Sequence, residues 1–361
     1  KICIKGKHAE SIRALEAACQ NERNISVFIL NDYYPAGDEQ QLVYDVTGRI
    51  VPVGGIPIDA GAVVQNVSTL KNIALAQQDI PVTHKRLTVT GEVAHPVTID
   101  APLGMSFRDC IALAGGPVDE EGYGLICGGP MMGYVEKNWD NVVTKTTGGL
   151  IVLKKDHPHF LRKAAPQSFN RNLAKSVCCQ CMRCTELCPR NAIGLGVKPH
   201  LAMRAAAYGS EYKDNGLFSC CNCGVCSFYA CPFGLTPSAI MTEAKMALAQ
   251  SGVKPQKRTP DGAHPFREYG KVPVHRLIAR LGLKKYDVPA PLLREELHPG
   301  QVRIPLKMHI GAPSECVVSV GQQVSVGDRI AKAPEGKLGV DIHASINGTV
   351  RAINANEIVI G

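Results

Sequence analysis

The sequence predicts a multidomain protein that combines an α/β domain, two β-rich domains and a helical domain. At 361 residues, the chain is long enough for two or three domains of about 150 residues each. Helix and strand patterns alternate at its start, whereas short strands between glycines fill its end. Ten cysteines gather between residues 178 and 231, which indicates a separate metal-binding region.

The overall composition excludes several classes of protein. No apolar run approaches the roughly 18 residues that a spanning helix needs, and no cleavable signal opens the chain. We therefore expect a cytoplasmic protein with no membrane span. The net charge is +8, with Lys and Arg gathered at 154–175 and 254–303. We interpret these stretches as solvated basic faces, or alternatively as a surface for an acidic redox partner or a pyrophosphate. No basic helix with interleaved aromatics accompanies them, so no nucleic-acid partner is expected.

Residues 1–84 are predicted to form an α/β domain. Apolar residues on one face predict a helix over 9–20, and an apolar run predicts a strand over 25–30. A Gly/Pro loop occupies 52–57, and residues 63–70 open a further helix whose first turn is polar. That polar start is either an anion site or simply a capped helix.

Residues 85–153 are predicted to form a β-grasp domain. Residues 86–93 and 96–100 alternate as strands, and a short helix follows over 106–114 before a Gly-Gly-Pro stop. Another strand is expected over 124–127. The succession of strand, strand, helix and strand is the reason for assigning this fold.

Cysteine usage points to metal in the middle of the chain. The sequence has fifteen cysteines, and a disulfide framework would spread them through a small secreted domain. Their clustering in a long chain without an export signal indicates metal ligands instead. We expect a helical domain over 170–251 that holds the metal.

The spacing of these cysteines indicates which metal centre they bind. The first run is Cys-x2-Cys-x2-Cys-x3-Cys-Pro from Cys178, and the second, from Cys220, has one extra residue before its last Cys. This is the bacterial ferredoxin run for a [4Fe–4S] cluster, in which the fourth Cys binds the opposite cluster. The pattern therefore predicts a dicluster ferredoxin domain with two sets of ligands. One set is Cys178, Cys181, Cys184 and Cys231, and the other is Cys220, Cys223, Cys226 and Cys188.

Two points stay open in this region. A zinc site is the competing interpretation, but zinc usually takes paired Cys-x2-Cys arms with four ligands in all. Cys179 and Cys221 each lie beside the first ligand of a run, so they either replace that ligand or are inert neighbours. The repeated Cys-Cys start supports an internal duplication.

The last part of the chain is predicted to be a small β domain. Residues 252–300 are rich in Pro, Lys and Arg and are interpreted as a linker. Residues 301–361 show short strands between Gly turns and resemble the barrel-sandwich hybrid fold of biotinyl and lipoyl domains. Lys337 lies where a carrier lysine would, but we expect it to be unmodified because the flanking Met or Asp of carrier motifs is absent.

Several motifs together resemble a known family. The Gly-Gly-Pro-Met-Met-Gly run at 128–133, Val-Gln-Asn-Val at 64–67, the two Cys runs and the terminal His309 and His343 motifs are similar to the RnfC component of Rnf-type electron-transport complexes. In that component the barrel comes first, whereas here it is last. This order resembles the cobalamin reductases of propanediol-utilisation microcompartments. The resemblance implies a flavin domain like the flavin subunit of respiratory complex I, an SLBB β-grasp domain, the dicluster domain and the hybrid barrel.

The resemblance also implies a flavin site. Carried over by motif, six residues of the first domain would line FMN: Tyr34, Asp38, Glu39, Gln65, Asn66 and Thr69. The family has a Gly-rich phosphate loop ahead of these elements, and none precedes Lys1. We therefore expect an N-terminally truncated chain that holds part of the flavin and NADH site. The full-length protein would bind FMN, and this fragment would bind it weakly or not at all.

The function implied by the resemblance is electron transfer from NADH, through FMN and two [4Fe–4S] clusters, to cobalamin, reducing cob(III)alamin to cob(II)alamin and cob(I)alamin. Its implied partners are cobalamin, a corrinoid adenosyltransferase and a microcompartment shell protein, and its implied location is a bacterial microcompartment. No residue is identified as catalytic. Two alternatives stay open, namely the electron-input component of an Rnf-type membrane complex and a non-catalytic electron wire.

Overall fold

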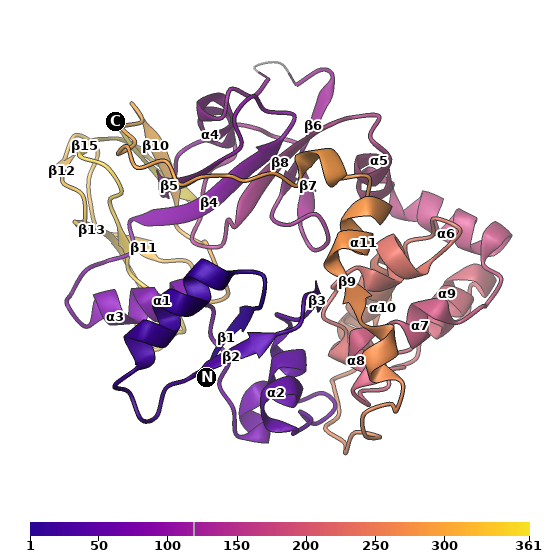
Figure 1. Cartoon of the computed structure of the whole chain (residues 1–361). Helices are drawn as coiled ribbons and strands as arrows, with labels where there is room; N and C mark the ends of the chain where they lie inside the picture. Colours follow the sequence, from indigo (N-terminus) through magenta and orange to yellow (C-terminus); the bar gives the residue numbers. More distant parts are fainter. Residues whose placement is uncertain (118–119) are drawn as a thin grey trace. The chain divides into compact units, whose positions relative to one another are not determined.

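The computed structural model describes residues 1–117 and 120–361 (Figure 1). Within these ranges the chain divides into two compact units. Unit 1 contains Lys1–Val64 and Ala164–Lys284, and unit 2 contains Gln65–Lys163 and Lys285–Gly361. Each unit draws on two separate stretches of sequence. No helix in the described ranges combines the length and the apolarity needed to cross a membrane.

The first part of unit 1 is a small α/β element. Strand β1 (Ile2–Lys5) pairs in parallel with β2 (Val27–Leu30), and helix α1 (Ala9–Cys19) connects them. Helix α2 (Glu39–Thr47) begins after Asp38, whose carboxylate caps it by accepting from the Gln41 amide. Strand β3 (Tyr33–Tyr34) ends four positions before this cap, so Tyr34 and Asp38 are near one another in sequence.

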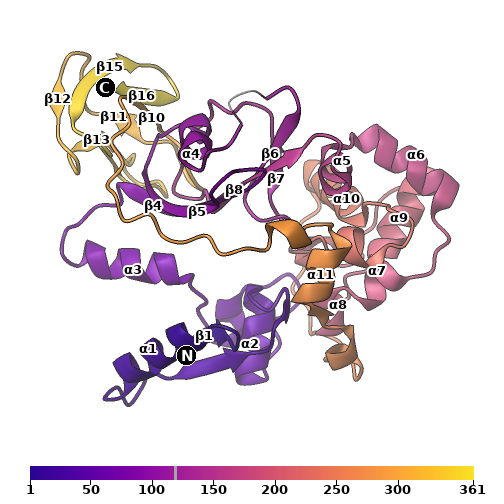
Figure 2. The ribbon, with the colours of Figure 1, turned by 45° about the horizontal axis from the view of Figure 1, so that its top comes forward.

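The second part of unit 1 is helical. Helix α9 (Pro199–Tyr208) packs on α6 (Gln167–Val177) and on α10 (Pro237–Gln250), as Figures 1 and 2 show in pink and orange. The cysteine runs occupy the loops around these helices. Those loops contain three short turns of helix, α7 (Arg183–Glu186), α8 (Pro189–Ala192) and η3 (Cys226–Ala230). The core beneath them contains Ile193, Leu195, Met203, Leu217 and Ile240.

The end of unit 1 differs from the connecting segment that its composition indicates. It contains the short turn η4 (Arg267–Gly270), strand β9 (Val272–Pro273) and helix α11 (Val274–Arg280). Strand β9 pairs antiparallel with β3, far away in sequence. Pairing of this kind depends on the partner strand, so the Pro, Lys and Arg content of the segment alone does not reveal it. A turn, η5 (Lys284–Tyr286), follows at the boundary of the units.

Unit 2 contains a mixed five-stranded sheet with the order β5-β4-β8-β6-β7. Strands β4 and β8 are parallel and the other neighbours are antiparallel. Helix α4 (Phe107–Leu113) starts at Ser106, whose hydroxyl accepts from the Asp109 amide. Helices α3 (Val67–Ala76) and α5 (Pro158–Ala164) also belong to this unit. The strands are β4 (His84–Gly91), β5 (Val97–Pro102), β6 (Tyr123–Cys127), β7 (Tyr134–Glu136) and β8 (Gly149–Lys154).

The Gly-rich loop between β6 and β7 packs against its own backbone. A Cβ on Gly133 would lie 2.5 Å from the Gly129 carbonyl oxygen, so only glycine fits. From α5, Lys163 donates to the Gly133 carbonyl, and the His159 ring bonds to the Pro130 carbonyl at 2.8 Å. These glycines therefore allow two parts of the loop's own backbone to lie close together.

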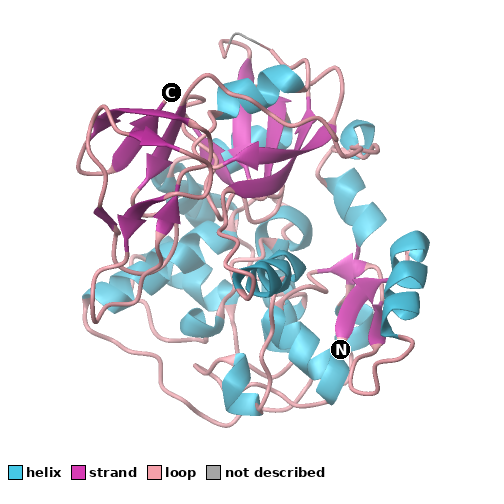
Figure 3. Cartoon of the chain, turned by 90° about the vertical axis from the view of Figure 1, so that its left-hand side faces the viewer, coloured by secondary structure: helices cyan, strands magenta, loops and turns pink. Residues whose placement is uncertain are grey.

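The last residues of unit 2 form two small sheets, which Figure 3 draws without any helix among them. One has the order β10-β16-β15-β12 and the other the order β11-β13-β14. Lys337 is exposed in the turn that follows β13. The strands are β10 (Val302–Pro305), β11 (Glu315–Cys316), β12 (Gln323–Val324), β13 (Arg329–Lys332), β14 (Ile342–His343), β15 (Gly348–Ile353) and β16 (Glu357–Ile360).

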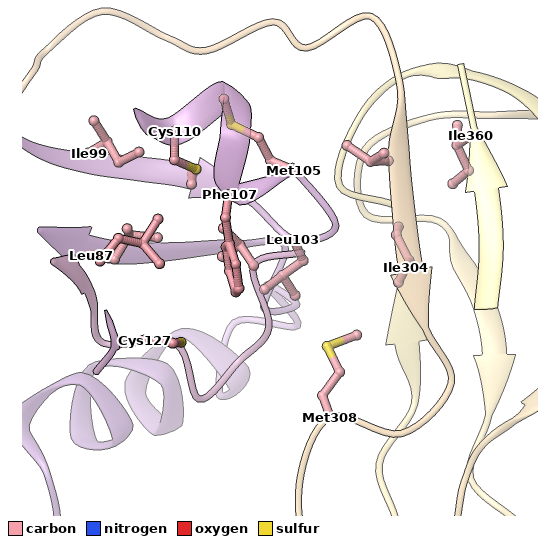
Figure 4. Close-up of a cluster of buried hydrophobic side chains, with 14 of the residues drawn as sticks. Leu87, Ile99, Leu103, Met105, Phe107, Cys110, Cys127, Ile304, Met308 and Ile360 are labelled. Atoms are coloured by element: carbon pink, nitrogen blue, oxygen red, sulfur yellow. The ribbon is translucent and has the colours of Figure 1, made fainter. Parts of the chain in front are cut away.

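One hydrophobic core serves both parts of unit 2. Figure 4 shows Leu87, Ile99 and Phe107 of the mixed sheet and its helix, together with Ile304 and Ile360 of the small sheets. All of these side chains are at most 2% exposed. Burial on this scale stabilises each large aliphatic side chain by about 1.5–3 kcal/mol. Unit 1 has a separate core of its own.

Candidate functional site

The two cysteine runs fold in the same way. Gln180 and Asn222, each two residues after the first Cys of a run, have positive φ angles of 56° and 53°. Met182 and Gly224, each four residues after it, also have positive φ, at 64° and 77°. Gln180, Met182 and Asn222 are three of the four non-glycine residues with this backbone in the described part of the chain. A positive φ costs free energy at residues other than glycine. Its repetition at equivalent positions therefore indicates that the two loops have the same role.

Alternating conformations of this type turn successive backbone N–H groups toward one side. The resulting concavity binds anions and is common around iron–sulfur clusters, which carry thiolate charge. Side chains and amides also reach the sulfur atoms. The Gln180 amide donates to Cys178 Sγ at 3.1 Å, and the Asn222 backbone N–H donates to Cys220 Sγ at 3.4 Å. Hydrogen bonds to sulfur are one of the means by which proteins set a cluster potential.

The first set of predicted ligands lies together. Cys178, Cys181, Cys184 and Cys231 line one cavity, although Cys231 is 47 residues beyond the nearest of the others in sequence. Helical residues close the cavity on its inner side, whereas Cys181 is exposed. This set is therefore close to the surface of unit 1.

The second set also lies together, but deeper. Cys188, Cys220, Cys223 and Cys226 line a second cavity, and all of them except Cys220 are buried. Cys188 is the residue just before helix α8 and reaches this set from the first run. The structure thus brings together the two groups of four that the spacing predicts, each with one cysteine from the other run.

The extra residue of the second run is taken up by a helical turn of a different pitch. Residues Cys226–Ala230 form a π-helical turn, whereas the equivalent stretch of the first run, Arg183–Glu186, is α-helical. A π turn accommodates one more residue than an α turn and occurs frequently at functional sites. Despite the longer spacing, Cys231 therefore still lies among the cysteines of the first set.

The chemistry of these thiols fits a bound metal cluster. Burial raises the pKa of Cys184 to about 12, and burial also raises the pKa values of Cys188 and Cys226 above the ordinary range. Such thiols ionise only when a cation compensates, as iron does on binding. Among the described residues, no three His, Cys, Asp or Glu side chains are placed to share a single metal ion. A cluster differs from a single ion because each thiolate binds its own iron atom.

The two additional cysteines have different surroundings. Cys179 is exposed, whereas Cys221 is partly buried beside the second set. A side-chain hydrogen bond with Cys223 and the positive charge of Arg190 lower the pKa of Cys221. Cys221 thus lies among the ligands of its set, and Cys179 lies at the rim of the other.

Residues predicted to line the flavin contact the second cysteine run. The Tyr34 hydroxyl donates to the Cys223 carbonyl oxygen at 2.8 Å. Asp38 forms a salt bridge of 2.6 Å with Arg190, two residues after Cys188, and both side chains are less than 10% exposed. Arg190 also donates to the Ser219 carbonyl, just before Cys220. Tyr34 and Asp38 therefore tie the α/β element to the loops that hold the second set.

The remaining predicted flavin residues are exposed. Glu39 follows Asp38 in the first turn of α2. Gln65, Asn66 and Thr69 belong to unit 2, where Asn66 caps α3 by accepting from the Ser68 amide. The polar start of this helix thus has a capping role in the structure, and an anion-binding role stays a prediction.

Sequence reasoning missed a group of buried residues beside the site. Gln41 donates to the Pro189 carbonyl, next to Cys188, and accepts from Arg267. Arg267 forms a 2.7 Å salt bridge with Asp45 and stacks on the ring of Tyr44. None of these residues has a spacing signal, because Gln41 and Arg267 are 226 positions apart. A buried arginine in a segment rich in Pro and Lys is recognisable only from the fold.

Comparisons with known proteins agree with this architecture. Family models confirm the predicted fold class of a complex-I-like flavin domain, an SLBB domain, a dicluster domain and a hybrid barrel. The matches are the Nuo51 FMN-binding domain over residues 1–75, the SLBB domain over 86–135, the 4Fe-4S dicluster domain over 177–236 and the RnfC barrel sandwich hybrid domain over 284–361.

Similar whole proteins were also found. Cobalamin reductase PduS of Salmonella typhimurium is 42% identical over 368 residues, which cover 99% of this chain and 80% of that protein. Its namesake from Citrobacter freundii is 40% identical with the same coverage. One component of the Na+-translocating ferredoxin:NAD+ oxidoreductase complex of Acetobacterium woodii is 35% identical over 190 residues, covering 52% of this chain and 40% of that component.

Proposed function

The chain belongs to the family of the cobalamin reductases PduS, and from this premise we propose that it passes electrons from NADH, through FMN and two [4Fe–4S] clusters, to cobalamin. The observation that carries the proposal is the gathering of eight cysteines into two sets of four in a chain of this family. Two one-electron carriers suit the reaction, because a hydride delivers two electrons whereas cobalt is reduced one electron at a time.

Each proposed cluster is held by three cysteines of one run and one of the other. Cys178, Cys181, Cys184 and Cys231 would hold the first cluster, and Cys220, Cys223, Cys226 and Cys188 would hold the second. When bound, FMN supplies conversion of hydride to single electrons and the clusters supply one-electron transfer. The chain itself buries the thiols, donates hydrogen bonds to their sulfur atoms and turns the backbone N–H groups of the two cysteine runs toward one side.

The proposed flavin residues are Tyr34, Asp38, Glu39, Gln65, Asn66 and Thr69. Support comes from the match of residues 1–75 to an FMN-binding domain and from the contacts that tie Tyr34 and Asp38 to the second cysteine run. The overall reaction balances as one NADH and two cob(III)alamin giving NAD+, one proton and two cob(II)alamin. A further electron per cobalt would give cob(I)alamin.

We also propose the division of labour along the chain. Residues 1–84 would be the partial flavin domain, 85–153 the SLBB β-grasp domain, 170–251 the dicluster ferredoxin domain and 301–361 the barrel-sandwich hybrid domain. The segment 252–300, expected as a linker, is divided between the end of unit 1 and the start of the second stretch of unit 2. A corrinoid adenosyltransferase is the proposed recipient of the product. A microcompartment shell protein is the proposed anchor, with the cytoplasm or a bacterial microcompartment as the location.

Anaerobic purification tests the proposal. We expect about eight iron and about eight sulfide per chain, and an EPR signal after reduction. In the full-length protein we also expect FMN after purification and NADH-dependent reduction of hydroxocobalamin, followed by absorbance, whereas the present chain would hold FMN weakly or not at all. Cys316 lies outside both sets, so a Cys316→Ser variant is the control and should give the same iron, sulfide and EPR results as the unaltered protein. Zinc in place of iron would contradict the cluster assignment. Intact clusters without flavin and without reductase activity would instead favour a non-catalytic electron wire.

A further inference from the structure

Unit 1 contains a cavity of about 710 Å³ to which the function above assigns no ligand, although Tyr34, proposed for the flavin, is one of its wall residues. Its size falls in the range of about 300–1,000 Å³ that is usual for small-molecule sites. The walls come from three places in the sequence: the first cysteine run with α9, the β3–α2 region, and the segment around η4. It is therefore built by the fold rather than by one loop.

This cavity adjoins the first set of cysteines. Met182 and His200 line it and also line the space enclosed by Cys178, Cys181, Cys184 and Cys231. His200 is fixed there by a 2.7 Å hydrogen bond between its Nδ1 and the hydroxyl of Thr185, itself a wall residue. A molecule in the cavity would be separated from the first cluster by single side chains.

The relative depth of the two sets gives a direction to the electron path. Tyr34 and Asp38, proposed for the flavin, contact the second, more buried run. The first set is the more exposed and adjoins the cavity. The ion pair of Asp38 with Arg190, which lies outside the cavity wall, is the contact that favours entry of electrons at the buried set; they would then leave at the exposed set, beside this cavity.

The lining favours a flat conjugated ligand that carries negative charge. Tyr33 and Tyr34 form part of the wall, and Phe266 and Tyr269 present rings that are 67% and 86% exposed. Exposed aromatic side chains at a cavity are typical of surfaces that stack on a ligand ring.

The charged residues of the lining are mainly cationic. The lining contains Lys198, Arg267, Lys271 and one carboxylate, Glu186. Arg267 is paired with Asp45 and Lys271 with Glu268, which leaves Lys198 as the cation of the lining without a salt bridge among the described residues. Arg267 is buried, and its Nε has no hydrogen-bond partner among the described residues. Because this Nε has almost no accessible surface, a ligand in the cavity would not reach it, and Lys198 is the exposed cation of the lining that an anionic group would contact.

We propose that this cavity is the docking site of the corrinoid that accepts the electrons. The proposal rests on the function proposed above. A corrinoid combines a conjugated ring with a phosphodiester and amide oxygens, and these match the aromatic and cationic groups of the lining. It would rest with one edge in the cavity, where one electron passes from the first cluster and Co(III) becomes Co(II). A flavin nucleotide shares the flat ring and the phosphate, so the test must distinguish the two.

Equilibrium dialysis of the anaerobic holoprotein with hydroxocobalamin, and separately with FMN, distinguishes them. The variants are Tyr269→Ala and Lys198→Glu. Matched controls are Tyr208→Ala and Lys213→Glu, which line a different cavity of unit 1. Tyr208 is 76% exposed, so neither tyrosine change removes a core residue. We expect each test variant to weaken cobalamin binding about tenfold, with the controls, the iron content and the FMN affinity unchanged.

Two results would overturn the assignment. If the test variants lose FMN affinity instead, the cavity belongs to the flavin. If they bind hydroxocobalamin as well as the controls do, the corrinoid docks elsewhere, while reduction by the unaltered protein would leave the proposed function intact. A wild-type protein that neither binds nor reduces hydroxocobalamin would reject the proposed function itself.

Discussion

Asp38 connects two parts of unit 1 through a single buried ion pair. Its partner Arg190 lies 152 positions away, and the two side chains are 8% and 6% exposed. Changing Asp38 to Asn keeps the shape but leaves the guanidinium charge buried without its counter-ion. Breaking such a pair costs about 3–5 kcal/mol, so we expect Asp38→Asn to lower the free energy of unfolding by about 3 kcal/mol. Urea denaturation of the anaerobic holoprotein, followed by circular dichroism, measures this.

Asp32→Asn is the matched control for that change. Asp32 pairs with Lys5 at 3.0 Å, but its side chain is 40% exposed, so its loss should cost less than about 1 kcal/mol. If the two variants lowered the free energy of unfolding equally, burial of the Asp38 pair would add nothing to stability. Because Arg190 also bonds to the Ser219 carbonyl, we expect Asp38→Asn to shift the redox potential of the second cluster as well.

His159 gives unit 2 a defined dependence on pH. Burial lowers its pKa from 6.5 to about 4, so below pH 6.5 the unfolded chain takes up a proton that the folded chain refuses. The contribution of His159 to the free energy of unfolding is therefore fully present above about pH 7 and is lost as the pH decreases toward 4. At pH 5 the loss attributable to His159 is on the order of 2 kcal/mol.

The measurement compares urea unfolding at pH 7 and pH 5, read by the fluorescence of Trp139, the one tryptophan of the chain, which lies in unit 2. In His159→Gln the drop in stability between these pH values should shrink by about 2 kcal/mol. His298→Gln changes an exposed histidine of the same unit and should behave as wild type. An unaltered drop in His159→Gln would contradict the assignment.

At the scale of elements, the short helical turns determine which cysteine serves which set. Cys188 precedes α8 and Cys231 follows the π turn, and each lines the cavity of the other run. We therefore expect Cys188→Ser to change the EPR spectrum in the same way as Cys223→Ser. Each change should remove up to about four of about eight irons.

The reciprocal pair is Cys231→Ser and Cys181→Ser, which should match each other and differ from the first pair. Cys179→Ser, beside the first set but at its exposed rim, is the control and should retain all the iron. A result in which Cys188→Ser resembles Cys181→Ser would mean that each run binds its own cluster.

What the sequence could predict at this scale depends on the range of the interactions. Two patterns are local, the cysteine intervals and the alternation of β4 and β5, and both could be recognised in a single sequence. The contact of Gln41 with Arg267 and the pairing of β3 with β9 join residues more than 200 positions apart, so no periodicity marks them. The cavity wall around η4 was overlooked for the same reason, because its Pro and Lys content resembles that of a linker.

At the scale of the whole molecule, the two units depend on different sources of stability. Unit 2 has a continuous apolar core of sheet and barrel residues, including Trp139, which is 2% exposed. The core of unit 1 includes Cys188 and Cys231 themselves, so its packing involves the groups that would hold iron. Metal binding contributes directly to folding where the ligands form part of the core.

Removal of iron should therefore affect the two units unequally. After treatment with a chelator and mild oxidant, we expect unit 1 to lose helical circular dichroism, because α9 and α10 pack over the emptied thiol loops. Trp139 in unit 2 should keep both its emission maximum and its thermal transition, since no predicted ligand lies in that core. Heating scans of the iron-loaded and iron-free protein, with both signals recorded, measure this. A simultaneous loss of the Trp139 transition would mean that the units fold as one cooperative body, and the separate cores would then have no thermodynamic independence.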